Sequence, residues 1–350
     1  MPSIDLKDQY FGCEIEMTGL TRQQAAEAVA SLFGTNAVHS RSSRTYDPWE
    51  VTDNEGKTWR FVYDSSIHGS HRTGRQQIPI GDGDYKVEMN SQKLEYSEMG
   101  KLQEVVRTLR HAGAVVNGSC GMHVHVDASN YMPQTLRNLV NIMAAKEDLL
   151  YKTLQVDVAR EDYCKKADTQ FLDVLNRKRP KTMQDLETLW YNGSSGRYRH
   201  YDHTRYHALN LHSVFSKGTI EFRLFNSTLH AGEVKTYIQL CLAISHQALV
   251  QKGASRARTH SDNEKYTFRT WLLRLGLIGD EFKTARMHLL KNLDGNIAWR
   301  DPAQEQKQKE RLEERRLEAR QALESVESEP VQTEESETEQ AETPAFSMTM

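Results

Sequence analysis

The chain has 350 residues, of which 38% are hydrophobic and 27% are charged, and its formal net charge at pH 7 is −3. This length allows one large domain or two ordinary ones, and the composition is that of a polar globular protein. No apolar run approaches the length of a membrane span, so the sequence excludes a transmembrane helix and predicts no membrane partner.

Charge is divided unevenly along the chain. Of the 45 basic and 48 acidic residues, residues 301–350 contain 6 and 14, which leaves 39 and 34 in residues 1–300. The first 300 residues therefore carry +5 and the last 50 carry −8. An excess of five positive charges is too small to indicate a nucleic-acid partner, but it suits a body that binds small anions.

The cysteines and the first residues favour a reduced, cytoplasmic protein. Cys13, Cys120, Cys164 and Cys241 are far apart and form no Cys-x-x-Cys pair. Neither a disulfide framework nor a zinc knuckle is therefore expected. Residues 1–10 are polar and lack the apolar segment of a secretory signal, so we expect a cytoplasmic location.

The first predicted strand runs from Tyr10 to Met17. Its alternation places Glu14 and Glu16 on one face and apolar side chains on the other. Two neighbouring carboxylates repel each other, and either a solvated strand face or a bound cation would relieve that repulsion. Residues 22–33 follow with apolar side chains at helical spacing and are predicted to form a helix.

Residues 36–84 are predicted to form short strands joined by long loops. The polar, cationic loop at 69–75 is either solvated or a phosphate clamp. A strand over 85–90 then carries Glu88, and an amphipathic helix is predicted over 97–112.

The most informative stretch runs from Asn117 to Asp127 and has the sequence NGSCGMHVHVD. Its small residues permit positive φ and the close approach of backbone or ligand. The strand that follows them places His123, His125 and Asp127 on one face. Such a strand is either a hydrogen-bonded structural element or the wall of a metal or phosphate site, and the carboxylate-bearing strands favour the second interpretation.

The second half of the chain is predicted to be mainly helical. The expected helices span 133–157, 161–176, 182–191 and 231–250, and the segments 263–275 and 280–290 are expected to be two more packing elements. Two strands are expected at 206–211 and 219–225, and the second places Glu221 and Arg223 on one face. Residues 196–212 are rich in Arg, Tyr and His, which is typical of either an RNA-binding segment or a site wall, and the two polar strand faces favour the wall.

The last 50 residues are predicted to lie outside a single folded domain of residues 1–300. Residues 301–326 alternate Glu, Arg, Gln and Leu, which predicts a charged, exposed helix. Residues 327–350 are acidic and poor in bulky apolar side chains, which predicts a disordered tail.

The polar strand residues together predict a site for metal ions and phosphate. Carboxylates with one or two imidazoles suit Mg²⁺ or Mn²⁺ better than zinc, and converging carboxylates need divalent ions to offset their repulsion. Basic side chains would bind phosphate oxygens. No Walker-type loop is present, so a nucleotide would have to lie between metals and basic side chains on a sheet.

Three strand motifs resemble, in the same order, the signature strands of the glutamine synthetase fold. They are Phe11-Gly12-x-Glu14-x-Glu16, Asn117-Gly118-Ser119-x-x-Met122-His123-x-His125 and Glu221-x-Arg223. The chain is most similar to the amidoligases, small carboxylate–amine ligases related to glutamine synthetase and glutamate–cysteine ligase. The resemblance extends to Trp59…Asp64-x-Ser66, the Glu88 strand and Arg205…Asn210-Leu211.

The resemblance implies an α+β fold with a mostly antiparallel curved sheet and flanking helices. It implies an ATP-dependent ligase that joins a carboxylate of an amino acid, peptide or protein to an amine through an acyl-phosphate. The implied ligands of two Mg²⁺ (or Mn²⁺) ions are Glu14, Glu16, Glu88, His123 and Glu221. The implied catalytic contacts to phosphate are His125, Arg205 and Arg223, and Asn210 joins them in the nucleotide site.

Two departures and two alternatives accompany this resemblance. Asp64-Ser65-Ser66 replaces the usual Asp-Gly-Ser, and no proline follows the Glu88 strand. Both departures concern the substrate-side loops.

A metal hydrolase or zinc protein would use Cys120, His123 and His125, although the three Glu-bearing segments argue against it. A non-catalytic binding module would use the acidic tail as its interaction surface.

Overall fold

The computed structural model describes residues 4–74, 76–299 and 301–327. The chain divides into two units, Met1–Arg300 and Asp301–Met350. The described part of the second unit is formed by helix α10 (Pro302–Glu327). From residue 328 on, the tail expected at 327–350 lies outside the described residues. Among the described residues, no helix combines the length and the hydropathy that membrane crossing requires.

The first unit is built on an eight-stranded sheet in the order β2-β3-β4-β7-β1-β8-β10-β9, and every neighbouring pair is antiparallel. The strands are β1 (Phe11–Met17), β2 (Ala37–His39), β3 (Trp49–Thr52), β4 (Thr58–Val62), β7 (Val87–Asn90), β8 (Gly121–Asp127), β9 (Leu209–Asn210) and β10 (Thr219–Asn226). A separate hairpin pairs β5 (Ser70–Thr73) with β6 (Gln76–Pro79). The predicted α+β fold with a mostly antiparallel sheet is thereby confirmed.

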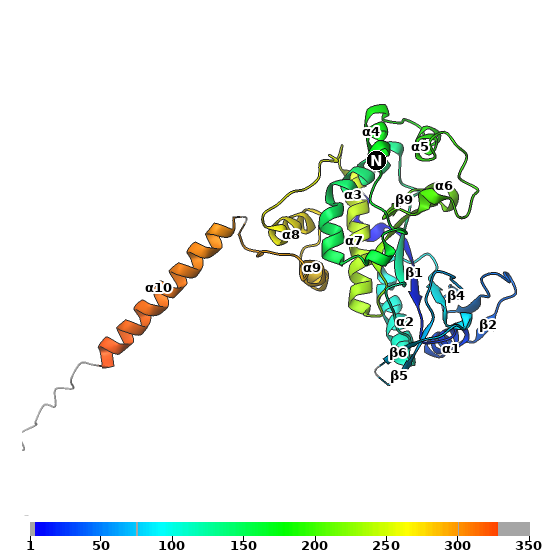
Figure 1. Cartoon of the computed structure of the whole chain (residues 1–350), viewed down its shortest axis with the longest axis horizontal. Helices are drawn as coiled ribbons and strands as arrows, with labels where there is room; N and C mark the ends of the chain where they lie inside the picture. The colour runs from blue at the N-terminus through cyan, green and yellow to red at the C-terminus, as the bar shows by residue number, and fades with distance from the viewer. Residues whose placement is uncertain (1–3, 75, 300, 328–350) are drawn as a thin grey trace, which may run out of the picture. The chain divides into compact units, whose positions relative to one another are not determined.

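Nine α-helices are described in the first unit, and several of them contact the sheet. They are α1 (Arg22–Phe33), α2 (Met99–Ala112), α3 (Pro133–Leu154), α4 (Thr169–Lys178), α5 (Met183–Trp190), α6 (His212–Lys217), α7 (Ala231–Val250), α8 (Glu264–Arg274) and α9 (Lys283–Leu290). Helices α2 and α7 lie alongside the sheet in Figure 1, and α7 contacts β8 while α3 contacts β10. The side chains of Ile15, Met89, Val124 and Phe222 point toward these helices and are fully buried. Because side chains alternate along a strand, the residues between them face the opposite way.

Two predicted elements are partly wrong. The helix expected over 161–176 begins only at Thr169, because the Asp168 carboxylate accepts the backbone N–H of Phe171 at 2.7 Å and caps it. The strand expected over 206–211 is reduced to the two residues of β9.

Helix α6, which no pattern predicted, follows β9 directly. The Asn210 side chain ends the strand by accepting the backbone N–H of His212 at 2.8 Å, and this contact lies at the start of α6. The preceding segment 203–205 forms a short 3₁₀ helix, η5 (His203–Arg205).

Gly19, just after β1, shows how closely the chain packs at the end of the central strand. Its φ is +88°, and a Cβ there would lie 2.7 Å from the backbone oxygen of Gly113 and 2.9 Å from Val115. Gly34, the C-cap of α1, also has a positive φ of +66°, but a Cβ there would meet no described atom within 4 Å.

We expect Gly19→Ala to lower the free energy of unfolding by about 3 kcal/mol, from backbone strain plus overpacking. Gly34→Ala should cost only about 1 kcal/mol, from backbone strain alone. Urea unfolding of both variants measures the difference, and equal losses would contradict the close contact at Gly19.

Candidate active site

The polar face of the sheet brings together residues that are far apart in the sequence. In the antiparallel register, Glu14 of β1 lies opposite His123 of β8, and Glu16 lies opposite Glu88 of β7. On the other side of β8, His125 lies opposite Glu221 of β10. The five predicted metal ligands and His125 are therefore neighbours on four adjacent strands.

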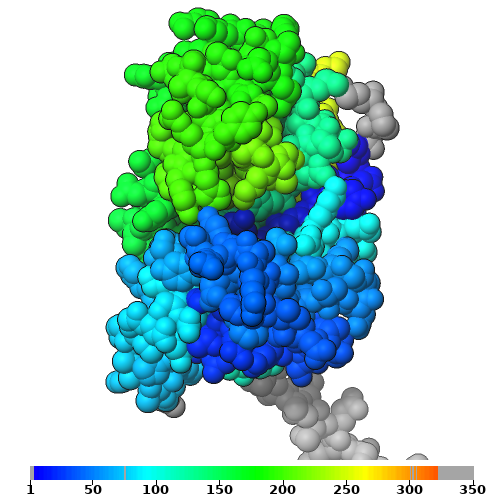
Figure 2. All heavy atoms as spheres, turned by 90° about the vertical axis from the view of Figure 1, so that its right-hand side faces the viewer, coloured from blue at the N-terminus to red at the C-terminus, as the bar shows by residue number. Residues whose placement is uncertain are grey.

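This face opens into a cavity of about 570 Å³, a size typical of sites for small molecules and cofactors. Figure 2 shows the molecule from this side, with N-terminal segments in blue and later segments in green facing each other across a hollow. Glu14, Glu88 and His125 lie in the wall of the cavity. Asp64, from the loop after β4, lines it beside them.

Three overlapping groups of side chains are placed as metal ligands would be. They are Glu14 with Glu88 and His123, Glu14 with His125 and Glu221, and Glu16 with Asp64 and Glu88. Within each group the potential ligand atoms all lie within 4.8 Å of one another. Carboxylates dominate every group, which is the ligand set that Mg²⁺ and Mn²⁺ prefer.

His123 lies at the centre of the carboxylates. Its Nδ1 is 3.0 Å from Glu14 and 3.7 Å from Glu221, and its Nε2 is 3.9 Å from Glu16. Burial, together with the nearby Arg223 guanidinium, lowers the pKa of His123 to about 4. The imidazole is therefore neutral at physiological pH, as a metal ligand must be.

Neighbouring histidines and an arginine keep two of the carboxylates ionised. Burial raises the pKa of Glu14, but the neighbouring His125 and the hydrogen bond with His123 outweigh it and hold the pKa well below its usual value. Burial likewise raises the pKa of Glu221, and the Arg223 guanidinium and His125 more than reverse this effect. Both side chains thus retain negative charge for a divalent ion.

Protons neutralise two other carboxylates. Burial and the neighbouring Asp64 raise the pKa of Glu16 to about 7. Burial and the carboxylates of Glu14 and Glu16 raise the pKa of Glu88 well above its usual value. In the absence of a divalent ion, the cluster therefore relieves its repulsion by holding protons.

Two polar atoms in the cluster have no hydrogen-bond partner within the described part of the chain. The Nε2 atom of His125 is buried and lies 3.1 Å from a Glu14 oxygen, outside hydrogen-bonding geometry. The side-chain oxygen of Asn90 is also buried without a partner. Since buried polar atoms are nearly always satisfied, these unpaired atoms and the excess of carboxylates fit a divalent cation.

Asn210 and Arg223 contact Glu221 and do not line this cavity, and Asn210 lines a smaller neighbouring pocket together with Glu221. The Asn210 amide donates to one Glu221 oxygen at 2.6 Å, and the Arg223 guanidinium donates to the other. Both side chains are nearly fully buried, at 1% and 5% exposure. Both residues therefore orient Glu221, and the contacts to phosphate that the sequence resemblance implied for them stay a prediction.

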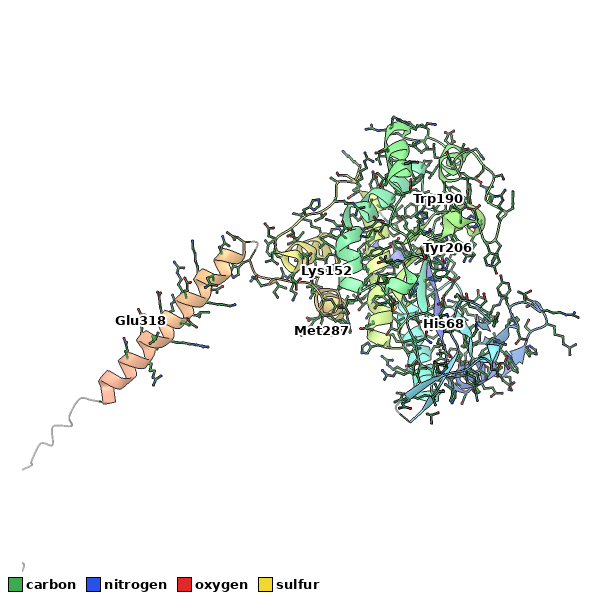
Figure 3. The ribbon with its side chains drawn as sticks, viewed as in Figure 1. His68, Lys152, Trp190, Tyr206, Met287 and Glu318 are labelled. Atoms are coloured by element: carbon green, nitrogen blue, oxygen red, sulfur yellow. The ribbon has the colours of Figure 1, made fainter. Side chains whose placement is uncertain are left out.

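Basic side chains surround the mouth of the cavity. Arg205 lies in its wall, donates to the backbone oxygen of His200 at 3.0 Å, and lies 5.7 Å from the rings of Tyr201 and Tyr206, the latter labelled in Figure 3. Lys217, the last residue of α6, also lines the cavity and reaches within 3.8 Å of a Glu14 oxygen. These cations are placed to attract an anionic ligand toward the carboxylate cluster.

Two loops meet across this cavity. The Tyr46 hydroxyl, from the loop before β3, lies 2.9 Å from Nε2 of His200 and 3.1 Å from the hydroxyl of Tyr201. All three residues line the cavity. Tyr46 is separated from His200 by 154 positions in the sequence and from Tyr201 by 155, so these hydrogen bonds connect the two sides of the site.

The comparisons with known proteins agree with the sequence motifs. A protein-family model described as "putative amidoligase enzyme" matches residues 7–245. The chain belongs to this amidoligase family. No curated protein matches it.

One similar solved structure is the glutamine synthetase of Plasmodium falciparum, which is 11% identical with a TM-score of 0.27. The match covers 73% of this amidoligase chain and 54% of the glutamine synthetase chain. The chain thus spans about half the length of that protein.

Sequence reasoning misses three residues of the cavity. Asp64 belongs to a recognised motif, but the motif alone does not assign its carboxylate to a metal site. Lys217 is predicted to lie in a turn, because no sequence pattern indicates helix α6. Tyr46 has no signal in the sequence, since its role depends on a contact with a distant loop.

A second cavity of about 640 Å³ lies between α3, α4 and α5. Its lining includes Trp190, labelled in Figure 3, whose indole N–H donates to the Thr204 hydroxyl at 2.9 Å. None of the three metal-ligand groups found among the described residues contributes to it. The segment 203–205 contributes to both cavities: His203 and Thr204 line the second cavity, and Arg205 lines the first.

We expect the affinity for Mn²⁺ to fall as the pH drops below about 7. A bound ion must displace the proton that Glu16 holds with its raised pKa, so deprotonation at higher pH favours binding. Each displaced proton contributes up to about tenfold in apparent affinity per pH unit. Titration of Mn²⁺ by electron paramagnetic resonance at about pH 6 and about pH 8 measures this dependence.

The control for this measurement is Glu16→Gln. It removes one of the two ligand carboxylates whose pKa is raised, so it should weaken binding and also reduce the pH dependence, and Glu88 accounts for the remainder. An affinity of the unmodified protein that does not change with pH would refute the assignment of Glu16 to the metal site.

Proposed function

We propose that this protein is an ATP-dependent ligase that joins a carboxylate to an amine through an acyl-phosphate. The observation that carries the proposal is one cavity that combines overlapping carboxylate groups with a basic rim. Membership of the amidoligase family supports the same chemistry. The four cysteines are free and buried, which fits the cytoplasmic location expected for an ATP-using enzyme.

The reaction would proceed in two balanced steps. A carboxylate oxygen of the substrate attacks the γ-phosphorus of ATP, the bond to the bridging oxygen breaks, and ADP leaves. The amine nitrogen then attacks the carbonyl carbon of the acyl-phosphate and loses a proton, and inorganic phosphate leaves. Both steps concentrate negative charge on phosphate oxygens, which the site must stabilise.

The side chains of the site would divide this task. Glu14, Glu16, Glu88, His123 and Glu221 would hold Mg²⁺ or Mn²⁺, with Asp64 and His125 as further ligands in the same groups. A divalent ion held there would neutralise phosphate charge and polarise the phosphorus–oxygen bonds. Arg205 and Lys217 would contact phosphate oxygens from the rim, while Asn210 and Arg223 keep Glu221 in place.

Exclusion of water would protect the acyl-phosphate from hydrolysis. The Tyr46 hydroxyl, with its contacts to His200 and Tyr201, joins two loops across the cavity. These loops would open for substrates and close over the intermediate. The clamp, defined as Tyr46, His200 and Tyr201, is thus the part of the site that couples phosphate transfer to amide formation.

The zinc or hydrolase alternative has less support. Cys120 is almost fully buried, and burial raises the pKa of its thiol to about 11, so it is not a thiolate. It belongs to none of the metal-ligand groups found among the described residues. A mixed carboxylate and imidazole site without thiolate favours Mg²⁺ or Mn²⁺.

We expect phosphate release from ATP that requires Mg²⁺, a carboxylate and an amine together. A pooled panel of amino acids and peptides supplies both substrates, and a colorimetric phosphate assay measures the release. Glu14→Gln should reduce the rate at least about a hundredfold, because it weakens two of the metal-ligand groups.

The matched control is Glu104→Gln on the exposed side of α2, which should retain the full rate. Absence of phosphate release across the panel, with no ATP binding by calorimetry, would count against the ligase and favour a binding module. Equal rates for both variants would remove Glu14 from the site.

We expect Tyr46→Phe to uncouple the reaction. Losing hydrogen bonds worth about 1 kcal/mol each shifts the balance toward the open loops by roughly five- to thirtyfold. The ratio of phosphate released to amide formed should rise, because water then reaches the acyl-phosphate. Tyr198→Phe, near His200 and Tyr201 on the opposite side of the clamp and 88% exposed, should leave the ratio unchanged. An unchanged ratio in Tyr46→Phe would show that the clamp does not exclude water.

A further inference from the structure

Strand β10 contains a one-residue bulge next to the carboxylate cluster. Phe222 pairs with Val124 of β8, but Phe225 pairs with Met122, so two residues of β10 face His123 alone. The first of these two residues is Arg223, whose guanidinium binds Glu221. A bulge bends a strand and redirects its side chains, so its geometry sets where Arg223 points.

The guanidinium of Arg160 occupies this bulge. Arg160 ends the short 3₁₀ helix η4 (Val158–Arg160) and is only 4% exposed. Its Nη1 donates to the backbone oxygen of Phe225, and its Nη2 donates to that of Arg223 at 3.2 Å. The planar fork of the Arg160 guanidinium thus donates hydrogen bonds to two backbone carbonyl groups of the bulge, where the regular hydrogen bonds between β8 and β10 are interrupted.

Two glycines of the NGSCGMH motif make room for this segment. A Cβ on Gly121 would lie 2.2 Å from Nη2 of Arg160, and a Cβ on Gly118 would lie 2.9 Å from the Asp157 carboxylate. Neither glycine has a positive φ. The close approach of the segment 157–160 therefore explains both Gly118 and Gly121. The positive φ that the sequence also permitted for these glycines does not occur.

Gly121 links the same guanidinium to the other side of the site. Its backbone N–H donates to a Glu16 oxygen at 2.6 Å, and β8 continues from it to His123. Arg160 therefore packs on the residue that holds Glu16 and also binds the strand that carries Glu221.

We infer that Arg160 is a positioning residue of this site, which sets the distance between Glu221 on β10 and Glu16 beside β8. The inference rests on the proposed function for its catalytic consequence, although the structural link is independent of the reaction. Arg160 does not line the cavity, so it acts through Arg223 and Gly121 without touching a ligand.

Three variants test this inference against matched controls. Arg160→Ala removes the fork, Arg160→Lys keeps the charge but offers a single donor point, and Gly121→Ala displaces the guanidinium. Arg286→Ala is the first control, because Arg286 also donates to two backbone oxygens, those of Leu277 and Gly279, away from the site. Gly100→Ala, whose Cβ would meet no described atom within 4 Å, is the second control.

The first readout is amide hydrogen exchange without any ligand. We expect exchange in residues 223–226 to accelerate in all three site variants and to remain unchanged in both controls. The second readout is Mn²⁺ affinity, which should fall about 10- to 100-fold in the site variants, as is typical when support of a metal ligand is lost. Guanidinium ion, added to Arg160→Ala well below denaturing concentrations, should restore part of this affinity.

The outcomes separate this inference from the proposed function. If hydrogen exchange and Mn²⁺ affinity change in the site variants but the unmodified protein shows no ligase activity, the role of Arg160 is supported and the proposed ligase function is refuted. Unchanged exchange at 223–226, or an Arg160→Lys variant equal to the unmodified protein in both readouts, would overturn the inference. If Arg160→Ala does not fold, Arg160→Lys and Gly121→Ala, which keep a cation at 160 or the native arginine, decide the question.

Discussion

Repulsion among buried carboxylates is the constraint on which this structure depends. Glu14, Glu16, Glu88 and Glu221 converge on one face of the sheet, where leaving several negative charges unpaired would cost many kcal/mol. The structure meets this cost in three ways. Histidines and Arg223 stabilise two of the charges, raised pKa values leave protons on two others, and the proposed divalent ion would offset the remaining repulsion.

The antiparallel sheet makes this convergence geometrically simple. Each of four neighbouring strands contributes one or two polar side chains from one face, while its other face packs on α2, α3 and α7. The register is therefore specified by the buried residues, such as Ile15 and Val124, since a slip by one residue would expose them and bury the carboxylates against the helices. The hydrophobic core thus aligns the ligand residues as a consequence of its own packing.

Much of this arrangement could be predicted from alternation along single strands, whereas features that pair distant segments could not. The polar faces of β1, β8 and β10 are recognisable because a period of two is visible within seven residues. The convergence of Glu14, Glu88, His123 and Glu221 followed from the resemblance in motif order, and the sheet register brings these residues together. The adjacent apolar residues Leu224 and Phe225 interrupt the alternation of β10 but do not by themselves identify a bulge, and the fork of Arg160 is visible only after β8 and β10 are paired. The clamp depends on two irregular loops, and α6 is a single short helix without a clear apolar stripe.

The contact between Gly121 and Arg160 also bears on how this sequence can change over time. A side chain at 121 and a guanidinium at 160 would occupy the same volume, so Gly121 cannot be enlarged without strain while Arg160 remains. We expect a side chain larger than glycine at 121 only in a sequence that lacks the arginine at 160. The contact therefore predicts that positions 121 and 160 vary together. Glycine at 121 is expected wherever position 160 is arginine.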